Sequence, residues 1–352
     1  VAEVSIPNGG TYIGKKAVQN GEYIDWSVDI NAGQSTIQNA KILDEPTSNQ
    51  VLVESSFHLF DTTVLSNGTY TKSTELVKGT DYSLAINTDN STGKQTFELL
   101  FLKPITKPSV LEYKTIIDAN DQEKVSNKIT LQGENITTEN VQTTTDIVVK
   151  VSGGSGTGTG ERGLIEIEKT DKSDATKKLE NVTFELYDKA GKKLMRTGVT
   201  DDLGILQLGG LRYGEYLLKE TKPAKGYLIS SELEVGKLIT VSKTAAPTKL
   251  TNALDVGTVE LKKVGSLDKT KGLKGAEFSL QDLAGVELQT GLTTNDAGIL
   301  TLTNVIPGTY RFIETKAPTG YQLNTTPYKF TLSEKSTSTL KLEMSNELLT
   351  GE

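Results

Sequence analysis

The sequence predicts an all-β protein made of tandem antiparallel sandwiches, and three observations indicate this class. Residues 24–30 alternate between apolar and polar side chains, which is the period of a half-buried strand. Turns rich in Asn, Asp and Gly separate short segments rich in Val, Ile, Thr and Tyr. Residues 163–255 match residues 256–349 at a constant offset of 94 without a gap. We therefore expect one sandwich over 1–152, two copies of a second sandwich, and a tail over 350–352.

The first sandwich is predicted to contain seven or more strands and no helix, because none of its segments has helical period. Turns such as the one at 87–94 bound these strands. Besides 24–30, the predicted strands are 40–43, 51–59, 95–102, 110–117, 124–131 and 143–151.

Residues 153–162 are predicted to be a flexible Gly/Ser/Thr linker. Their glycines could instead form a phosphate-binding loop, but such a loop needs a following Gly-Lys-Ser/Thr and a helix. Glu161, Arg162 and a predicted strand follow here, which favours the linker.

Composition excludes several classes of function. The 352 residues carry a net charge of −7 with both signs interspersed, which indicates a solvated surface and no nucleic-acid partner. The absence of cysteine excludes disulfides, cysteine nucleophiles, thiolate metal sites and thioester crosslinks. No apolar run reaches membrane-spanning length, and no signal peptide opens the chain. The chain ends in NELLTGE after a predicted strand, so we expect a piece of a longer protein.

Each repeat places three polar residues on the apolar face of a predicted strand. Residues two apart share a face of a strand, so Lys169, Glu220 and Asn252 lie among apolar neighbours. The second repeat has the equivalent residues Lys263, Glu314 and Asn346. The lysine-to-glutamate spacing is 51 and the glutamate-to-asparagine spacing is 32 in both copies. Burying these groups is costly unless they satisfy one another.

An amide bond between the lysine and asparagine side chains, formed with loss of ammonia, would remove most of that cost. Burial favours a neutral amine, which is nucleophilic, and a neutral carboxylic acid, which can polarise the asparagine carbonyl. Alternatively, the lysines snorkel, the glutamates form salt bridges and the asparagines cap turns. Identical spacing in two copies favours the crosslink. Lys262 is the alternative lysine of the second repeat, on the opposite face of its strand.

The repeats resemble the B-type domains of staphylococcal collagen adhesin and of Gram-positive pilins. The resemblance covers nearly all of 163–349 and rests on IEIEKTD and VELKKVG, NVTFELYD and GAEFSLQD, ETKPAKGY and ETKAPTGY, and KLTN and EMSN. It implies an immunoglobulin-like sandwich with isopeptide bonds Lys169–Asn252 and Lys263–Asn346, assisted by Glu220 and Glu314. The second repeat departs from the family pattern at Gly265, where Asp is common.

Residues 1–150 resemble the A-type, reversed-immunoglobulin-like domains of the same adhesins. The resemblance rests on GKKAVQNGEYIDWSVDIN, AKILDEPTS, LEYKTII and VSNKITL. It implies a third bond, Lys15–Asn127, assisted by Asp44, and strand parity places all three on apolar faces. Lys16 remains open as the lysine, and Asp25 is a weaker candidate for the acid.

Other chemistry has little support in the sequence. His58 is the only histidine, and we expect an ordinary strand residue rather than part of a zinc site or triad. The acidic segment 118–124 lacks the pattern of a calcium loop, so a solvated turn is expected. We expect no cofactor, no metal and no catalytic turnover beyond the self-crosslinking.

The expected function is that of a stalk in a Gram-positive surface adhesin, extracellular and anchored to the cell wall. A bond between first and last strands closes almost a whole domain, which by analogy with disulfides contributes about 4–5 kcal/mol. Expected partners are other domains of the same surface protein, with no membrane insertion. The alternatives are an A-type module that binds a host extracellular-matrix protein such as collagen, or a covalently polymerised pilin shaft subunit.

Overall fold

A computed structural model describes residues 12–134, 136, 142–151, 161–243 and 246–350. Almost all of its regular elements are strands, as expected for the all-β class. Contacts divide the chain into two compact units. The first contains the amino-terminal sandwich and most of the first repeat, and the second contains the second repeat with three short segments of the first. The predicted linker residues 153–160 and the end of the tail, 351–352, lie outside the described residues.

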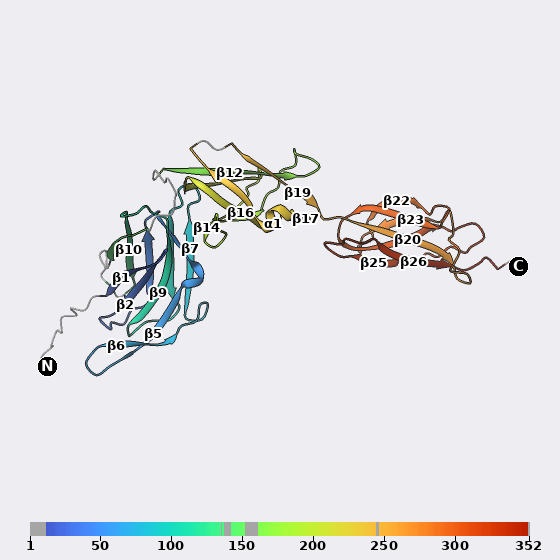
Figure 1. The fold of residues 1–352 in the computed structure, drawn as a ribbon. Coiled ribbons are helices and arrows are strands. Elements are labelled where there is room, and N and C mark those ends of the chain that lie inside the picture. Colours follow the sequence, from blue (N-terminus) through green and yellow to red (C-terminus); the bar gives the residue numbers. More distant parts are fainter. Residues whose placement is uncertain (1–11, 135, 137–141, 152–160, 244–245, 351–352) are drawn as a thin grey trace. The chain divides into compact units, whose positions relative to one another are not determined.

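The amino-terminal sandwich consists of two antiparallel sheets (Figure 1). One sheet has the order β1-β2-β9-β5-β6, with β4 beside β9, and the other has the order β11-β10-β3-β8-β7. The strands are β1 Ile13–Asn20, β2 Tyr23–Ile30, β3 Lys41–Pro46, β4 Gln50–Leu52, β5 His58–Val64, β6 Tyr70–Glu75, β7 Tyr82–Thr88, β8 Gln95–Phe101, β9 Ser109–Ile117, β10 Lys124–Gln132 and β11 Gln142–Val148.

The core of this sandwich forms around Trp26 on β2. The alternation predicted for this strand is present, since its apolar residues are buried and the residues between them are half-buried. The Trp26 ring stacks on Tyr113, and its Nε1 donates a hydrogen bond to Thr115 Oγ1 at 2.9 Å. Both partners lie on β9, so the central strand pair of the sheet is held by side chains as well as by its backbone ladder.

One predicted strand of the amino-terminal sandwich is wrong in its extent. Residues 51–59 form two strands, β4 and β5, separated by a 3-10 turn over Glu54–Ser56. The Ser56 hydroxyl donates to the Val53 carbonyl at 2.6 Å and closes the turn. Polar side chains at 54–56 compete with the sheet ladder for backbone groups, and this competition interrupts the strand.

Two strands of this sandwich, β6 and β7, were not predicted from the sequence. Nearly all side chains of β6 are exposed, so its sequence has no apolar alternation. Strand β7 lies at the edge of its sheet, and its side chains do alternate, with Tyr82 buried, Leu84 and Ile86 half-buried, and the residues between them exposed. Periodicity reports burial, so β6 gives no signal, whereas the alternation of β7 was present and overlooked.

The two repeats have the same architecture. The first forms the sheets β15-β12-β19-β17 and β14-β13-β16-β18, and the second forms β23-β20-β26 and β22-β21-β24-β25. The first contains β12 Arg162–Asp171, β13 Thr183–Asp188, β14 Leu194–Val199, β15 Ile205–Arg212, β16 Gly214–Lys222, β17 Tyr227–Leu228, α1 Ser231–Val235, β18 Lys237–Val241 and β19 Thr248–Leu254. The second contains β20 Gly257–Gly265, β21 Glu277–Gln281, β22 Glu287–Thr293, β23 Ile299–Val305, β24 Gly308–Lys316, β25 Tyr328–Leu332 and β26 Leu340–Asn346.

The first and last strands of the second repeat lie side by side and run parallel. Register pairs Val259 with Leu340, Lys263 with Met344 and Gly265 with Asn346. Lys263 and Asn346 therefore lie on neighbouring strands two register positions apart, on the same face of the sheet. Glu314 belongs to β24 in the opposing sheet. The topology alone thus brings the three residues toward one interior.

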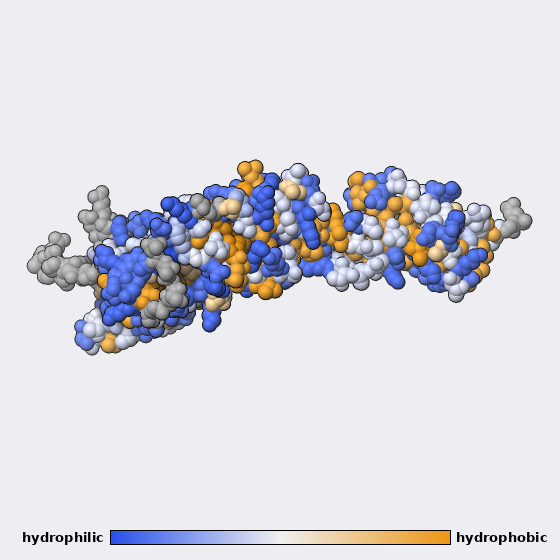
Figure 2. Space-filling model, turned by 45° about the horizontal axis from the view of Figure 1, so that its top comes forward, coloured by the Kyte–Doolittle hydropathy of each residue, from blue (hydrophilic) through white to orange (hydrophobic). Residues whose placement is uncertain are grey.

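The surface is mixed in character. On the face drawn in Figure 2, apolar residues lie among hydrophilic ones. In the described part of the chain, no helix has the length and apolar character needed to cross a membrane.

Candidate crosslinking sites

The second repeat brings Lys263, Glu314 and Asn346 together in its core. All three are buried, and the lysine and glutamate side chains are fully so. Lys263 Nζ lies 3.4 Å from Glu314 Oε1. Asn346 Nδ2 donates to Glu314 Oε1 at 2.8 Å and to Oε2 at 2.9 Å. The carboxylate is therefore the group that lies between the amine and the amide.

Two atoms of this site lack a hydrogen-bond partner among the residues that the structure describes. They are Lys263 Nζ and Asn346 Oδ1. An unsatisfied buried polar group costs about 1–3 kcal/mol, so the Asn346 carbonyl oxygen adds a cost to the arrangement without a covalent bond. Burial also lowers the pKa of Lys263, an effect that the nearby Glu314 charge opposes. A lowered pKa increases the fraction of neutral, nucleophilic amine.

An aromatic ring forms one wall of this site. Phe278 on β21 stands opposite Glu314 in the register of β21 and β24. Its ring centroid lies 5.7 Å from Lys263 Nζ. The apolar ring excludes water from the amine, which is the cause of the desolvation. An ammonium over a ring is also a stable arrangement without any crosslink.

The first repeat holds the equivalent residues in equivalent positions. Lys169 Nζ lies 2.8 Å from Glu220 Oε2, and both side chains are fully buried. Phe184 takes the place of Phe278, with its ring centroid 5.7 Å from Lys169 Nζ. Burial lowers the pKa of Lys169. Asn252 is buried on β19, the neighbour of β12 in the sheet.

Gly265 replaces the Asp that is common in the family, and the second repeat thereby lacks a hydrogen bond that the first repeat makes. In the first repeat Asp171 occupies this position, and its carboxylate accepts a hydrogen bond from the Tyr227 hydroxyl at 2.9 Å. In the second repeat a Cβ at Gly265 would lie 3.1 Å from the Tyr321 hydroxyl. Tyr321 corresponds to Tyr227, so the tyrosine is retained and packs against the glycine backbone where its acid partner is missing.

The amino-terminal sandwich places Lys15, Asp44 and Asn127 in one buried group. Lys15 Nζ donates to Asp44 Oδ2, and both side chains are fully buried. Asp44 Oδ2 also accepts from the Tyr113 hydroxyl at 2.8 Å, and Asn127 Nδ2 donates to the same hydroxyl at 2.9 Å. Asn127 Oδ1 has no hydrogen-bond partner in the described part of the chain. Lys15 lies on β1 and Asn127 on β10, so the group joins the two sheets.

Burial shifts both ionisable partners of this group toward their neutral forms. It lowers the pKa of Lys15 to about 8, although the Asp44 charge opposes the shift. It raises the pKa of Asp44, against the opposing effect of Lys15. Transfer of the shared proton from Lys15 to Asp44 therefore costs less here than in water.

Tyr113 is a member of this buried group that the sequence did not identify. It is fully buried, stacks against Trp26 and Phe57, and links the acid to the amide. Burial and the Asp44 charge raise the pKa of its hydroxyl far above the usual range, so the hydroxyl stays protonated. The only signal was a tyrosine on the apolar face of a predicted strand, which equally describes a core residue.

The alternative residues lie away from these groups. The Lys16 side chain is 78% exposed and lies 4.0 Å from Asp29. Asp25 is half-buried on the other face of the sheet and pairs with Lys114 at 3.5 Å. Lys262 is half-buried, while Lys263 beside it is fully buried.

His58 contacts one acid and belongs to no metal-binding cluster among the described residues. Its Nδ1 lies 2.6 Å from Glu75 Oε1, and both side chains are about half exposed. Within the described ranges, no group of three or more His, Cys, Asp or Glu side chains could hold a metal ion.

The prediction of a solvated turn at 118–124 is wrong for its first residue. Asp118 is buried, and its Oδ2 accepts a hydrogen bond from Arg162 Nη1 at 2.8 Å. Arg162, assigned from the sequence to the linker, is the first residue of β12. Local sequence patterns cannot indicate this pair because its members are distant in the chain.

Comparison with solved structures found chains that overlap with this one at low identity. The TIE protein of Bacillus anthracis is 19% identical with a TM-score of 0.46, and the match covers 97% of this chain and 59% of that one. A carboxy-terminal fragment of the pilus adhesin SpaC of Lactobacillus rhamnosus is 18% identical with a TM-score of 0.38, covering 54% and 99%. The major pilin subunit BcpA of Bacillus cereus is 17% identical with a TM-score of 0.25, covering 53% and 100%.

Comparison with family models gave matches in every sandwich. Residues 13–142 match the collagen binding domain. Residues 163–252 and 257–348 each match the SpaA prealbumin-like fold domain. No curated protein matches the chain. Because the two repeat matches together span more than half of the sequence, the chain belongs to the family of SpaA prealbumin-like fold domains.

Proposed function

We propose that this chain is the stalk of a Gram-positive surface adhesin and that an intramolecular Lys–Asn amide bond locks each sandwich. The bonds are Lys15–Asn127, Lys169–Asn252 and Lys263–Asn346. The observation that supports them best is the second-repeat site, where an amine and an amide oxygen are buried without hydrogen-bond partners in the described structure. The protein acts outside the cell and is anchored to the cell wall.

The bond forms by proton transfer, nucleophilic attack and loss of ammonia. The lysine gives a proton to the buried carboxylate, and its neutral Nζ attacks Cγ of the asparagine. The carboxylic acid stabilises the developing oxyanion and then gives its proton to Nδ2, and the carboxylate that remains takes the second proton from Nζ. The Nζ–Cγ bond forms, the Cγ–Nδ2 bond breaks, and ammonia leaves. Because the groups are already held together, proximity supplies much of the rate.

The orientation of the asparagine amide matters for this reaction. In the structure Asn346 directs Nδ2 toward both carboxylate oxygens of Glu314. A half-turn about χ2 exchanges Nδ2 and Oδ1, which brings the carbonyl oxygen to the acid. A protonated Glu314 can then donate to the oxygen and polarise the carbonyl. The Asn324 backbone N–H, which donates to Glu314 Oε2 at 2.8 Å, holds the acid in place.

The reaction modifies the chain once and has no external substrate. It is therefore not enzymatic turnover. Its product links residues at the beginning and end of each repeat and joins β1 to β10 in the amino-terminal sandwich. Open states of each domain become rarer because the chain cannot separate there. Resistance to proteases and to pulling follows, which suits a stalk exposed to shear.

Intact mass spectrometry of the purified, denatured chain tests the proposal. The mass should lie below the mass calculated from the sequence by the mass of three ammonia molecules. Glu220→Ala, Glu314→Ala and Asp44→Ala should each restore one of them, with peptide mapping showing which linked pair is lost. A chain of full calculated mass would contradict the proposal. Lys16→Ala is the matched control for Lys15→Ala and should leave the loss unchanged.

Replacing Tyr113 with phenylalanine should slow bond formation in the amino-terminal sandwich. The hydroxyl connects Asp44 to Asn127, and losing one hydrogen bond to a charged group, about 1.5 kcal/mol or more, corresponds to about tenfold or more in rate. Peptide mapping at timed intervals after synthesis measures the fraction of linked Lys15–Asn127. Tyr82→Phe, at another buried tyrosine of the same sandwich, is the control. An unchanged rate would remove Tyr113 from the mechanism.

The family match of the first sandwich favours a second function, which is ligand binding. Residues 13–142 match the collagen binding domain, and the second function is that this sandwich binds an extracellular-matrix protein in addition to serving the stalk. Binding of the full chain to immobilised collagen, compared with a fragment containing only the two repeats, separates the two functions. Equal binding by both would contradict a role of the first sandwich.

A further inference from the structure

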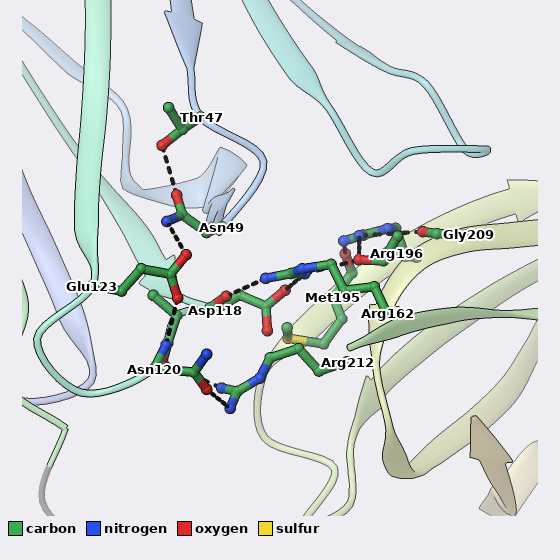
Figure 3. A network of polar contacts seen from close by, with 12 residues as sticks. Thr47, Asn49, Asp118, Asn120, Glu123, Arg162, Met195, Arg196, Gly209 and Arg212 are labelled. Carbon is green, nitrogen blue, oxygen red and sulfur yellow. Dashed lines mark hydrogen bonds and ion pairs between the residues drawn. The ribbon is translucent and has the colours of Figure 1, made fainter. Parts of the chain in front are cut away.

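The first compact unit contains a polar contact between the amino-terminal sandwich and the first repeat (Figure 3). Arg162 Nη1 donates to Asp118 Oδ2 at 2.8 Å, and Arg162 Nη2 donates to the Asp118 carbonyl at 2.7 Å. Arg212 Nη2 donates to Asn120 Oδ1 at 2.6 Å, and its Nη1 donates to the Ala119 carbonyl at 3.2 Å. Two arginines of the repeat thus bind three consecutive residues of one turn.

The sandwich holds this turn ready for the arginines. Glu123 Oε2 accepts from the Asn120 backbone N–H at 2.8 Å, and Glu123 Oε1 accepts from Asn49 Nδ2 at 2.9 Å (Figure 3). These bonds lie within the sandwich and fix the orientation of the turn. A preorganised turn loses little conformational entropy when the arginines bind it.

A second turn of the sandwich packs against Gly209 and Gly210 of the repeat. The Gly209 N–H donates to the Asn90 carbonyl at 2.6 Å. A Cβ at Gly209 would lie 2.0 Å from the Ser91 carbonyl oxygen, and one at Gly210 would lie 1.9 Å from that of Thr92. Any side chain at these positions would collide with backbone, so only glycine permits the contact.

The same turn also packs against a buried arginine of the repeat. A Cβ at Gly93 would lie 1.9 Å from Arg196 Nη2. Arg196 is buried, and its Nη1 donates to the Met195 carbonyl at 2.8 Å. The guanidinium is thus covered by glycine on one side and held by its own strand on the other.

The second repeat lacks every residue that makes this contact. At the constant offset of 94, Arg162, Arg196 and Arg212 correspond to Val256, Thr290 and Ile306. Gly209 and Gly210 correspond to Thr303 and Asn304. The backbone at the last position is nevertheless alike, since Gly210 has φ 65° and Asn304 has φ 56°. The fold is shared, and the surface chemistry is specific to the first repeat.

We propose that this face of the first repeat is a dedicated docking surface for the amino-terminal sandwich, which makes the two domains one rigid body. The arginines bind the 118–120 turn, and the glycine pair accepts the 89–93 turn. The docking does not depend on the crosslinks, because none of their residues takes part. The second repeat cannot replace the first in this role.

Distances between spin labels in the full chain test the docking. The chain has no native cysteine, so Ser73→Cys and Asp202→Cys label one exposed site in each domain without interference. Pulsed electron paramagnetic resonance should give a narrow distance distribution. Gly209→Ala should broaden it severalfold, because the new Cβ collides with the Ser91 carbonyl oxygen. The matched control is Thr303→Ala at the equivalent position of the second repeat.

Asp118→Ala provides an independent variant on the other side of the contact. This substitution removes the carboxylate that binds Arg162 and changes no residue of the first repeat. It therefore still tests the docking if Gly209→Ala disturbs β15. Circular dichroism identifies any variant that is unfolded. A broad distribution in the parent chain, or one that stays narrow in both folded variants, would overturn the proposal.

Discussion

Replacing Glu314 with alanine should lower the free energy of unfolding of the second repeat by about 4–5 kcal/mol, if the missing bond acts like a disulfide of equal loop length. The bond between Lys263 and Asn346 would close nearly the whole domain, so its loss returns a large conformational entropy to the unfolded chain. A domain of this size shifts its melting temperature by about 4–8 °C per kcal/mol, so the fall should be on the order of 20 °C.

Differential scanning calorimetry of the full chain measures this effect. The transition of the second repeat should move while the others stay in place, and the intact mass should rise by one ammonia. Glu343→Ala, which removes an exposed glutamate from β26, is the control and should change neither quantity. A variant that loses the ammonia as the parent does, yet melts lower, would assign Glu314 a packing role only.

Under a pulling force, the amino-terminal sandwich should lengthen by about 70 Å while the two repeats stay closed. In the second repeat the force would pass from Lys263 through the bond to Asn346, so residues 264–345 carry no load. In the first sandwich, by contrast, Asn127 lies well before the end of the domain. The 21 residues from Lys128 to Val148 stay outside the bond and can peel away at about 3.3–3.6 Å each.

Single-molecule force spectroscopy on the full chain distinguishes these cases by contour length. Glu314→Ala should add one extension of roughly 300 Å, which is the length of a whole repeat of about 90 residues. Asn127→Ala should likewise convert the short extension of the first sandwich into a long one. If the parent chain already gives full-length extensions from the repeats, the bonds do not carry the load.

Most residues of the candidate crosslinking sites could be predicted because side chains alternate between the two faces of a strand. In a strand, residues two apart share a face, so Ile165 and Ile167 imply the direction of Lys169. The second repeat places Lys263 on an apolar strand face at the same spacing, and this repetition argues against a chance placement. The structure buries both lysines fully. This prediction holds whichever strands are neighbours, because the direction of each side chain follows from its own strand alone.

Features that depend on distant parts of the chain could not be predicted. Tyr113 belongs to its site only because β9 faces β3 and β10 across the sandwich, and its own strand shows nothing unusual. Asp118 looked like a solvated acid because its partner Arg162 is 44 residues away. Local periodicity carries no information on such pairings.

The parallel pairing of β20 and β26 also determines when a repeat can lock. The lysine is made near the beginning of the domain, but its acceptor lies on the last strand to be synthesised. Until that strand is added, the amine has no amide to attack, and the repeat remains unlinked. The bond can form only after the first and last strands have met. The presence of the bond in a repeat would therefore show that its first and last strands had already paired.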